Sequence, residues 1–246
     1  VTVTIENLFR VDGDVTLNEP TNQVTTVNVD FQANLVVAGG GNFTVNRASD
    51  PSGTLDATAG DSELVFRGSG SVINTDGSFE IARVTSRASG NVTIGNGSDP
   101  TDLTVTEEIK TLEGGFEVAD NADTDFSPAE DAKVTRRIPS SNAAATQIST
   151  PNAGTFNNDG NGYDLAYIGP GSGAADQELS SNVQDLTVGT PQSATEVTST
   201  GSPELSGLLT VWGRLAGTEI TLSSTSGDHV VVGELASELN VPQGND

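Results

Sequence analysis

The chain is built from short runs of alternating apolar and polar residues, each closed by a cluster of turn-forming residues. The first six residues, Val-Thr-Val-Thr-Ile-Glu, alternate strictly. From Phe43 to Val134 comparable runs recur at a spacing of about ten residues, which is typical of all-β folds. A period of two places every second side chain on one face of a strand, whereas an amphipathic helix needs a period of 3.6. The chain is therefore predicted to be all-β.

The dipeptides between these runs favour antiparallel pairing. Asp76-Gly77, Asn96-Gly97 and Gly114-Gly115 are combinations that two-residue hairpin loops prefer, because such loops need positive φ angles. The sequence thus predicts an antiparallel sandwich or barrel of the jelly-roll kind. A parallel β-helix is the minor alternative, because no repeat is visible in which side-chain types recur in register.

Three segments receive more specific structural predictions. Helical turns are predicted over 102–112 and 232–239. Large side chains on both faces of the run from Leu208 to Leu215, including Trp212, predict either a central strand or a face covered by a partner.

The length of 246 residues fits one large β-rich unit covering 1–246 or a split arrangement. In the split, residues 1–39 and 163–246 form a main barrel and residues 43–138 form an inserted second β-domain. Residues 139–162 contain few apolar side chains and are predicted to be a linker or long loop.

Charge is the strongest compositional feature, since 34 acidic residues face 10 basic ones and the formal net charge is -24. Molar salt shortens the Debye length to about 3 Å and would screen most of the resulting repulsion. With only two lysines, no Cys and no Met, the composition resembles that of proteins from halophilic archaea and their viruses. An acidic surface protein of a non-halophile is the alternative.

The same composition disfavours several functions. Direct nucleic-acid binding needs clustered Lys and Arg, and Arg136-Arg137 is the only such pair. The absence of Cys excludes disulfides and Cys-based metal sites. No run approaches the roughly 18 apolar residues of a membrane span. A start at Val1 fits removal of an initiator Met, and 1–11 lacks the pattern of a signal peptide.

The stretch from Gly68 to Ile81, GSGSVINTDGSFEI, contains Gly68-x-Gly70, which resembles the start of a dinucleotide-binding glycine loop. Such a loop must open a helix, and the turn residues Asn74 to Gly77 interrupt the chain where that helix should begin. No cofactor is therefore predicted, and the two glycines are interpreted as strand or loop residues.

Two acid-rich segments invite a calcium interpretation. Over 120–131, Asp123, Asp125 and Ser127 fit the first ligands of an EF-hand, but Pro128 and Val134 occupy the positions of its required Gly and Glu. Over 157–164, Asp159, Asn161 and Asp164 show a similarly poor spacing. No metal site is predicted, although cations from concentrated salt are possible partners.

No catalytic residue is predicted. His229 is the only histidine and is expected at the start of a strand as a turn residue. No spacing singles out a carboxylate pair for acid–base chemistry. The chain is interpreted as a protein without enzymatic activity.

In composition and strand layout the chain resembles the acidic single β-barrel capsid proteins of internal-membrane icosahedral viruses of halophilic archaea. That resemblance implies barrels that assemble into capsomers with copies of the protein and other structural subunits, with the virion as the location. The alternative is an extracellular structural protein of a haloarchaeon, either in a surface layer or matrix or in a filament whose subunits donate the strand 1–11. A secreted binding module or carbohydrate-active module is a third candidate.

Overall fold

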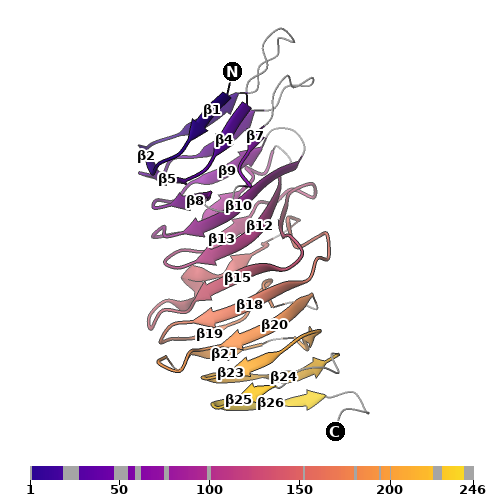
Figure 1. The fold of residues 1–246 in the computed structure, drawn as a ribbon. Coiled ribbons are helices and arrows are strands. Elements are labelled where there is room, and N and C mark those ends of the chain that lie inside the picture. The colour runs from indigo at the N-terminus through magenta and orange to yellow at the C-terminus, as the bar shows by residue number, and fades with distance from the viewer. Residues whose placement is uncertain are drawn as a thin grey trace.

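The structure, a computed structural model, is formed almost entirely of β-strands (Figure 1). It describes residues 2–18, 28–46, 55–58, 62–74, 78–98, 101–151, 153–179, 182–193, 195–199, 201–223 and 229–240. Within these ranges the only helical element is a single 3-10 turn, η1 (Ala143–Thr146). The all-β prediction is confirmed.

The strands are short and follow one another closely. In the N-terminal half they are β1 (Thr2–Ile5), β2 (Phe9–Asp12), β3 (Val15–Asn18), β4 (Asn28–Phe31), β5 (Asn34–Ala38), β6 (Phe43–Asn46), β7 (Leu55–Asp56), β8 (Glu63–Phe66), β9 (Ser71–Asn74), β10 (Ser78–Ser86), β11 (Val92–Ile94), β12 (Asp102–Thr111) and β13 (Phe116–Val118). In the C-terminal half they are β14 (Asp125–Pro128), β15 (Ala132–Arg137), β16 (Ile148–Ser149), β17 (Thr155–Phe156), β18 (Tyr163–Ile168), β19 (Ser172–Ala174), β20 (Val183–Val188), β21 (Glu196–Thr198), β22 (Glu204–Leu205), β23 (Leu209–Val211), β24 (Arg214–Leu222), β25 (Val230–Val231) and β26 (Glu234–Asn240).

These strands form a parallel β-helix. The chain visits a three-stranded sheet, a twelve-stranded sheet and a six-stranded sheet in turn, as in β1, β2 and β3, and then repeats the circuit one level further on. In the C-terminal half a five-stranded sheet joins the circuit. Figure 1 shows the resulting coils stacked from the N-terminus to the C-terminus. The twelve-stranded sheet, called the long sheet below, extends from β2 to β25.

The predicted antiparallel sandwich or jelly roll is therefore wrong. All ladders between the named strands are parallel, so each strand pairs with a strand one coil away instead of with its neighbour in sequence. A corner of a coil and a hairpin need the same turn residues, so the turn dipeptides do not distinguish the two folds. Coil length also varies, since Leu64 pairs with Val84 but Val134 pairs with Leu165. The uneven spacing hides the repeat in the sequence.

The predicted hairpins are corners between sheets. Asp76-Gly77 lies outside the described residues, but the strands on either side of it, β9 and β10, belong to the six-stranded sheet and the long sheet and do not pair. Asn96-Gly97 and Gly114-Gly115 likewise separate strands of different sheets. The predicted helical turns at 102–112 and 232–239 are wrong. These segments contain strands β12 and β26 instead, which pair with β10 and β24 of the neighbouring coils.

Strand pairing connects the segments of the predicted domain split. The long sheet continues from the first 39 residues through 43–138 to 163–246, and β15 pairs with β18 directly. Residues 139–162 contain η1, β16 and β17 and complete one coil. Both arrangements, one β-rich unit over 1–246 and the split into two domains, stay predictions.

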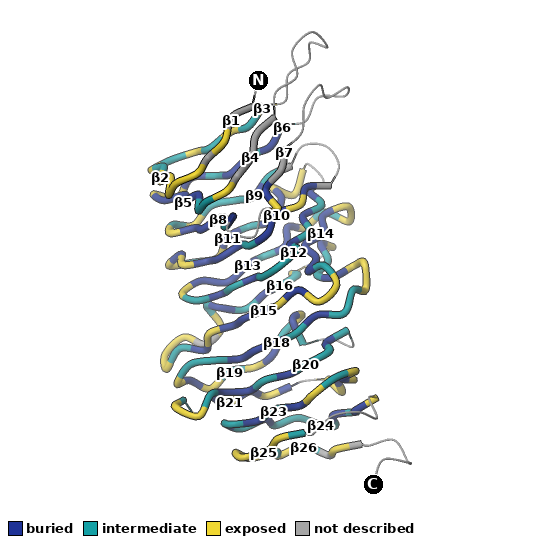
Figure 2. Tube along the Cα trace, viewed as in Figure 1, coloured by how far each residue is buried: buried dark blue, intermediate teal, exposed yellow. Residues whose placement is uncertain are grey.

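The core consists of rows of apolar side chains inside the coils. One row in the long sheet consists of Leu35, Leu64, Val84, Ile109, Val134, Leu165, Leu186 and Leu209, each the partner of the next. All of them are at most 2% exposed. Figure 2 shows buried segments along each coil, with exposed residues mainly at the corners and at the two ends. Removal of these side chains from water is the main force that holds successive coils together.

Glycines allow the corners to stack closely. A Cβ on Gly41 would lie 1.9 Å from the Gly13 carbonyl oxygen, and one on Gly70 would lie 2.1 Å from the Gly41 oxygen. A Cβ on Gly68 would lie 2.3 Å from the Gly40 nitrogen. The glycines that resemble a phosphate-binding loop therefore let one corner of the β-helix approach the corner of the preceding coil.

Candidate functional site

The two ends of the β-helix carry the exposed apolar side chains. Among the described residues the large hydrophobic side chains that are exposed are Leu8, Phe9, Leu208, Val230, Val231, Val232 and Leu239. All of them lie in the first coil, in the last coil or, for Leu208, directly before β23. Elsewhere on the described surface the apolar rows face inward. The exposed apolar surface is thus concentrated in the first and last described coils.

At the N-terminal end the exposed side chains belong to the interior rows. Phe9 pairs with Leu35 and Val11 pairs with Val37. Leu35 is 2% exposed, whereas Phe9 is 51% exposed because no described strand of the long sheet lies on its other side. The first coil therefore ends in uncovered core positions.

The C-terminal end is open in the same way. Val231 follows Val211 in an inward row, and its exposure is 46% against 0% for Val211. Leu239 follows the fully buried Ile220 and is 38% exposed. Repeat proteins normally finish with polar terminal repeats that protect such rows from water. The described residues at these two ends provide no such cover.

The outer face of the long sheet concentrates the positive charge of this acidic chain. Apart from the buried Arg136, most of its ten basic residues lie in or directly after the strands from β2 to β15: Arg10, Arg67, Arg83, Arg87, Lys110, Lys133 and Arg137. Several are paired, as in Arg83–Glu107 at 2.8 Å and Lys110–Glu108 at 2.7 Å. A shallow hollow of about 370 Å³ between β2 and β10 is lined by Arg10, Arg67 and Arg87 above Val36 and Val65. Glu63 also lines the hollow, so its charge is mixed.

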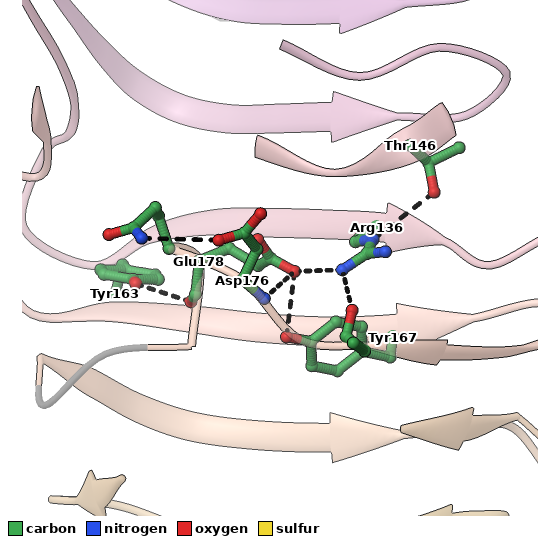
Figure 3. Close-up of polar contacts among 8 residues, drawn as sticks. Arg136, Thr146, Tyr163, Tyr167, Asp176 and Glu178 are labelled. Atoms are coloured by element: carbon green, nitrogen blue, oxygen red, sulfur yellow. Dashed lines mark hydrogen bonds and ion pairs between the residues drawn. The ribbon is translucent and has the colours of Figure 1, made fainter. Parts of the chain in front are cut away.

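Inside the coils, Arg136 and Glu178 form a buried ion pair, which Figure 3 shows. Both side chains are 0% exposed. Glu178 Oε1 accepts hydrogen bonds from Arg136 Nη1 and from the Tyr167 hydroxyl at 3.2 Å. Arg136 Nη1 also donates to the Ala174 carbonyl at 2.7 Å. The Tyr163 hydroxyl donates to the Glu178 backbone carbonyl at 2.7 Å.

This network joins two parts of the chain inside the coils. Arg136 occupies an inward position between Thr111 and Tyr167, where most other coils carry an apolar side chain. Its partner Glu178 comes from the connection between β19 and β20, so the pair ties that connection to the long sheet. Burial, followed by the Glu178 charge, raises the pKa of Tyr167 well above its ordinary value of 10.0. The phenol therefore stays protonated, and the closed surroundings indicate a structural role.

The sequence did not identify this pair as a site. In the sequence, Arg136-Arg137 indicates only a basic cluster, whereas the alternation of β15 places Val134 and Arg136 inward and Lys133 and Arg137 outward. An arginine in phase with buried valines is the signal that could have indicated a buried acidic partner. Glu178 lies outside the alternating runs, so the sequence offers no comparable signal for it.

Several side chains of the two acid-rich segments form hydrogen bonds within the protein. Asp125 is 8% exposed, and its carboxylate accepts hydrogen bonds from Ser127 at 2.6 Å and from Thr155 at 3.0 Å. Asp123 is exposed, and Asn161 donates to the Pro128 carbonyl at 3.2 Å. Among the described residues no group of three or more His, Asp or Glu side chains is placed to hold a metal ion.

Two carboxyl groups have shifted pKa values. Burial raises the pKa of Asp102, and the charges of Asp125 and Asp159 raise it further. Burial and the nearby Asp185 raise the pKa of Asp164. Both residues lie on strands of the long sheet. Asp102 pairs with Asp125 across the ladder, whereas Asp164 pairs with Lys133 and accepts a hydrogen bond from the Asp185 backbone amide at 3.4 Å. These shifts reflect crowded acidic side chains in successive coils.

The structure also describes His229 and the run around Trp212, for which the sequence makes specific predictions. His229 directly precedes β25, and its Nδ1 accepts a hydrogen bond from the Leu209 backbone amide at 3.1 Å. The run around Trp212 is not buried on both faces, since Leu209, Val211 and Leu215 are fully buried while Leu208 is 36% exposed. Trp212 is half-buried and lines a shallow hollow with Glu196 and Arg214.

Among the described residues, none of the helical structure has the length and apolar character that crossing a membrane would require. Comparisons of the chain with models of known families, with curated proteins and with solved structures give no match.

Proposed function

We propose that this protein is a structural subunit that assembles with copies of itself in concentrated salt. The observation that carries the proposal is the concentration of exposed apolar side chains at the two ends of the β-helix. An exposed patch of core-type side chains on an otherwise acidic molecule favours a protein contact. The proposal assigns the protein no catalytic step.

The acidic surface sets the conditions for this assembly. With a net charge of -24, two copies repel each other strongly in dilute buffer. At about 3 M salt the Debye length falls to roughly 3 Å, so the repulsion acts only between charges in near contact. Apolar contacts between ends can then dominate. The proposed working environment is therefore hypersaline.

The geometry favours an extended assembly over a closed shell. The two ends of a β-helix are different surfaces, and a contact between different surfaces generates a ring or an open filament. We therefore favour the extracellular structural protein, as a filament or layer subunit of a haloarchaeon. A virion subunit is the second candidate. Parallel coils differ from the antiparallel barrels that the capsid resemblance implied.

Sedimentation velocity at about 0.2 M and 3 M KCl tests the proposal, because these concentrations span the change in screening. We expect oligomers that grow with protein concentration at high salt and a monomer at low salt. A monomer at every concentration in 3 M KCl would overturn the proposal.

Matched variants separate end contacts from general effects of charge. The double variant Phe9→Lys with Val231→Lys places cations on the two exposed ends, and we expect it to stay monomeric. Thr44→Lys with Thr187→Lys changes the net charge equally at outward positions of interior strands. This control should assemble like the unmodified protein. Equal assembly of both double variants would exclude the ends as the contact.

A further inference from the structure

We infer that the shallow hollow beside Trp212 is a binding site for a neutral carbohydrate. The hollow has a volume of about 580 Å³ and lies on the side of the β-helix, along the corner where the chain passes from the long sheet to the five-stranded sheet. Residues from four successive coils line it, among them Ser172, Glu196, Trp212, Gly213, Arg214 and Glu234. The inference concerns this side surface and does not depend on the proposed self-assembly.

A row of polar side chains runs along the hollow at the start of the five-stranded sheet. Strand pairing aligns, each beside the next, Ser172, Glu196, Arg214 and Glu234. The Ser172 hydroxyl donates a hydrogen bond to Glu196 Oε2, and Arg214 Nε forms an ion pair with Glu234 Oε1 at 3.3 Å. Each contact orients a carboxylate through one oxygen and leaves the second oxygen to accept a hydrogen bond from a ligand. The row therefore offers carboxylate acceptors and guanidinium donors side by side, on strands about 4.8 Å apart.

Trp212 adds an apolar surface next to this row. Its side chain is half-buried and lies outside the apolar core, although indole side chains are highly buried on average. The neighbouring Gly213 has no side chain, and a Cβ there would lie 1.9 Å from the Thr195 carbonyl oxygen. The corner beside the indole is therefore bare backbone, which leaves the hollow open to a ligand.

An aromatic ring beside paired donors and acceptors matches the chemistry of a sugar. The C–H face of a sugar ring packs on an aromatic plane, while its hydroxyls donate to carboxylates and accept from a guanidinium group. Two carboxylates and one guanidinium give the row a net negative charge on a chain of net charge -24, so an anionic ligand is repelled. A protein partner needs a contact of roughly 800 Å² on each side, whereas the large apolar side chain of the hollow is one indole. A neutral sugar chain is the ligand class that fits.

Tryptophan fluorescence tests this site directly, because the chain contains one Trp and its emission reports on the hollow alone. The probes are the neutral oligosaccharides maltohexaose, cellohexaose and mannohexaose, titrated in about 3 M KCl, where charge repulsion is screened. We expect at least one of them to shift the emission to shorter wavelength in a saturable manner, because a stacked sugar removes water from the indole. Hexagalacturonate, an anionic probe, should bind more weakly. No saturable shift with any neutral probe would overturn the inference.

Matched variants locate the bound sugar, with isothermal titration calorimetry as the measurement and circular dichroism as the check on folding. We expect Trp212→Ala and Arg214→Gln each to weaken binding about tenfold or more, and Trp212→Phe, which keeps an aromatic ring, to weaken it less. Arg83→Gln is the control, because it removes a comparable arginine–carboxylate pair, with Glu107, on the outer face of the long sheet. This control should bind the sugar like the unmodified protein. Unchanged affinity in both Trp212→Ala and Arg214→Gln would place the sugar elsewhere and overturn the inference.

Discussion

At the scale of single residues, the structure departs most from a simple alternating pattern at Arg136. The position is inward and fully buried, and its charge is balanced by Glu178. Two buried ions lose their hydration, and mutual attraction with good hydrogen bonds offsets that loss only while both partners are present. The pair is therefore costly to break and of modest net benefit as a whole.

A double-mutant cycle can measure the difference between removing one partner of the ion pair and removing both. Arg136→Met and Glu178→Leu alone each leave a buried charge without its partner, and we expect each to lower the free energy of unfolding by about 3–5 kcal/mol. The double variant removes both charges and should recover most of the loss. Urea unfolding at constant molar salt provides the values. Strictly additive losses would show that the two side chains do not depend on each other.

Tyr167 provides a pH-dependent test of the same network. Because folding raises its pKa, the folded state favours the protonated phenol, so stability is complete below pH 10 and falls as pH rises above that value. We expect the urea midpoint to decrease above pH 10 and to decrease less in Tyr167→Phe. The chain has two tyrosines, so ultraviolet titration of this variant separates them. Ionisation of Tyr167 near its ordinary pKa in the folded protein would contradict the prediction.

At the scale of strands and corners, local sequence predicted elements well but not their partners. Between Phe43 and Val134, where alternating runs are predicted at a spacing of about ten residues, the structure has short strands such as β8 and β13. Alternation and turn residues are local properties, and both survive in the structure. Whether a strand pairs with its neighbour or with a strand one coil away depends on the path of the chain, which short runs do not encode.

Corner stacking gives a prediction for the element scale. Gly70→Ala would place a Cβ 2.1 Å from the Gly41 carbonyl oxygen, so two rigid backbone segments would have to separate. We expect a loss of about 1–3 kcal/mol in unfolding free energy from this overpacking. Gly201→Ala is the control, because nothing lies within 4 Å of its Cβ position. If both variants melt at the same temperature, the corners are not close-packed.

At the scale of the whole molecule, composition indicates a saline environment, which stays a prediction, and it does not indicate the architecture. Net charge and scarce lysine indicated adaptation to salt without reference to a fold. The exposed ends were not predictable, because Phe9 and Val231 lie in the same alternating pattern as side chains that are fully buried in the middle coils. These two side chains are exposed because no described strand of the long sheet lies beyond β2 or β25.

Salt dependence should follow from the same charge. The pKa values of Asp102 and Asp164 are raised partly by neighbouring acids, which shows that acidic side chains in successive coils repel one another. We expect the thermal midpoint to rise steadily between about 0.1 and 3 M KCl as this repulsion is screened. At low salt the midpoint should also rise when the pH is lowered from 7 toward 4, because protonation removes the repulsion. A midpoint independent of salt would contradict this account.

The shape of the assembly tests the central claim most directly, since end-to-end joining lengthens the molecule without widening it. Small-angle X-ray scattering of the unmodified protein in about 3 M KCl, where the charges are screened, measures both dimensions over a series of protein concentrations. The proposed contact between the two ends predicts a constant cross-sectional radius of gyration and a maximum dimension that grows with concentration. A cross-section that widens as the particles grow would contradict it.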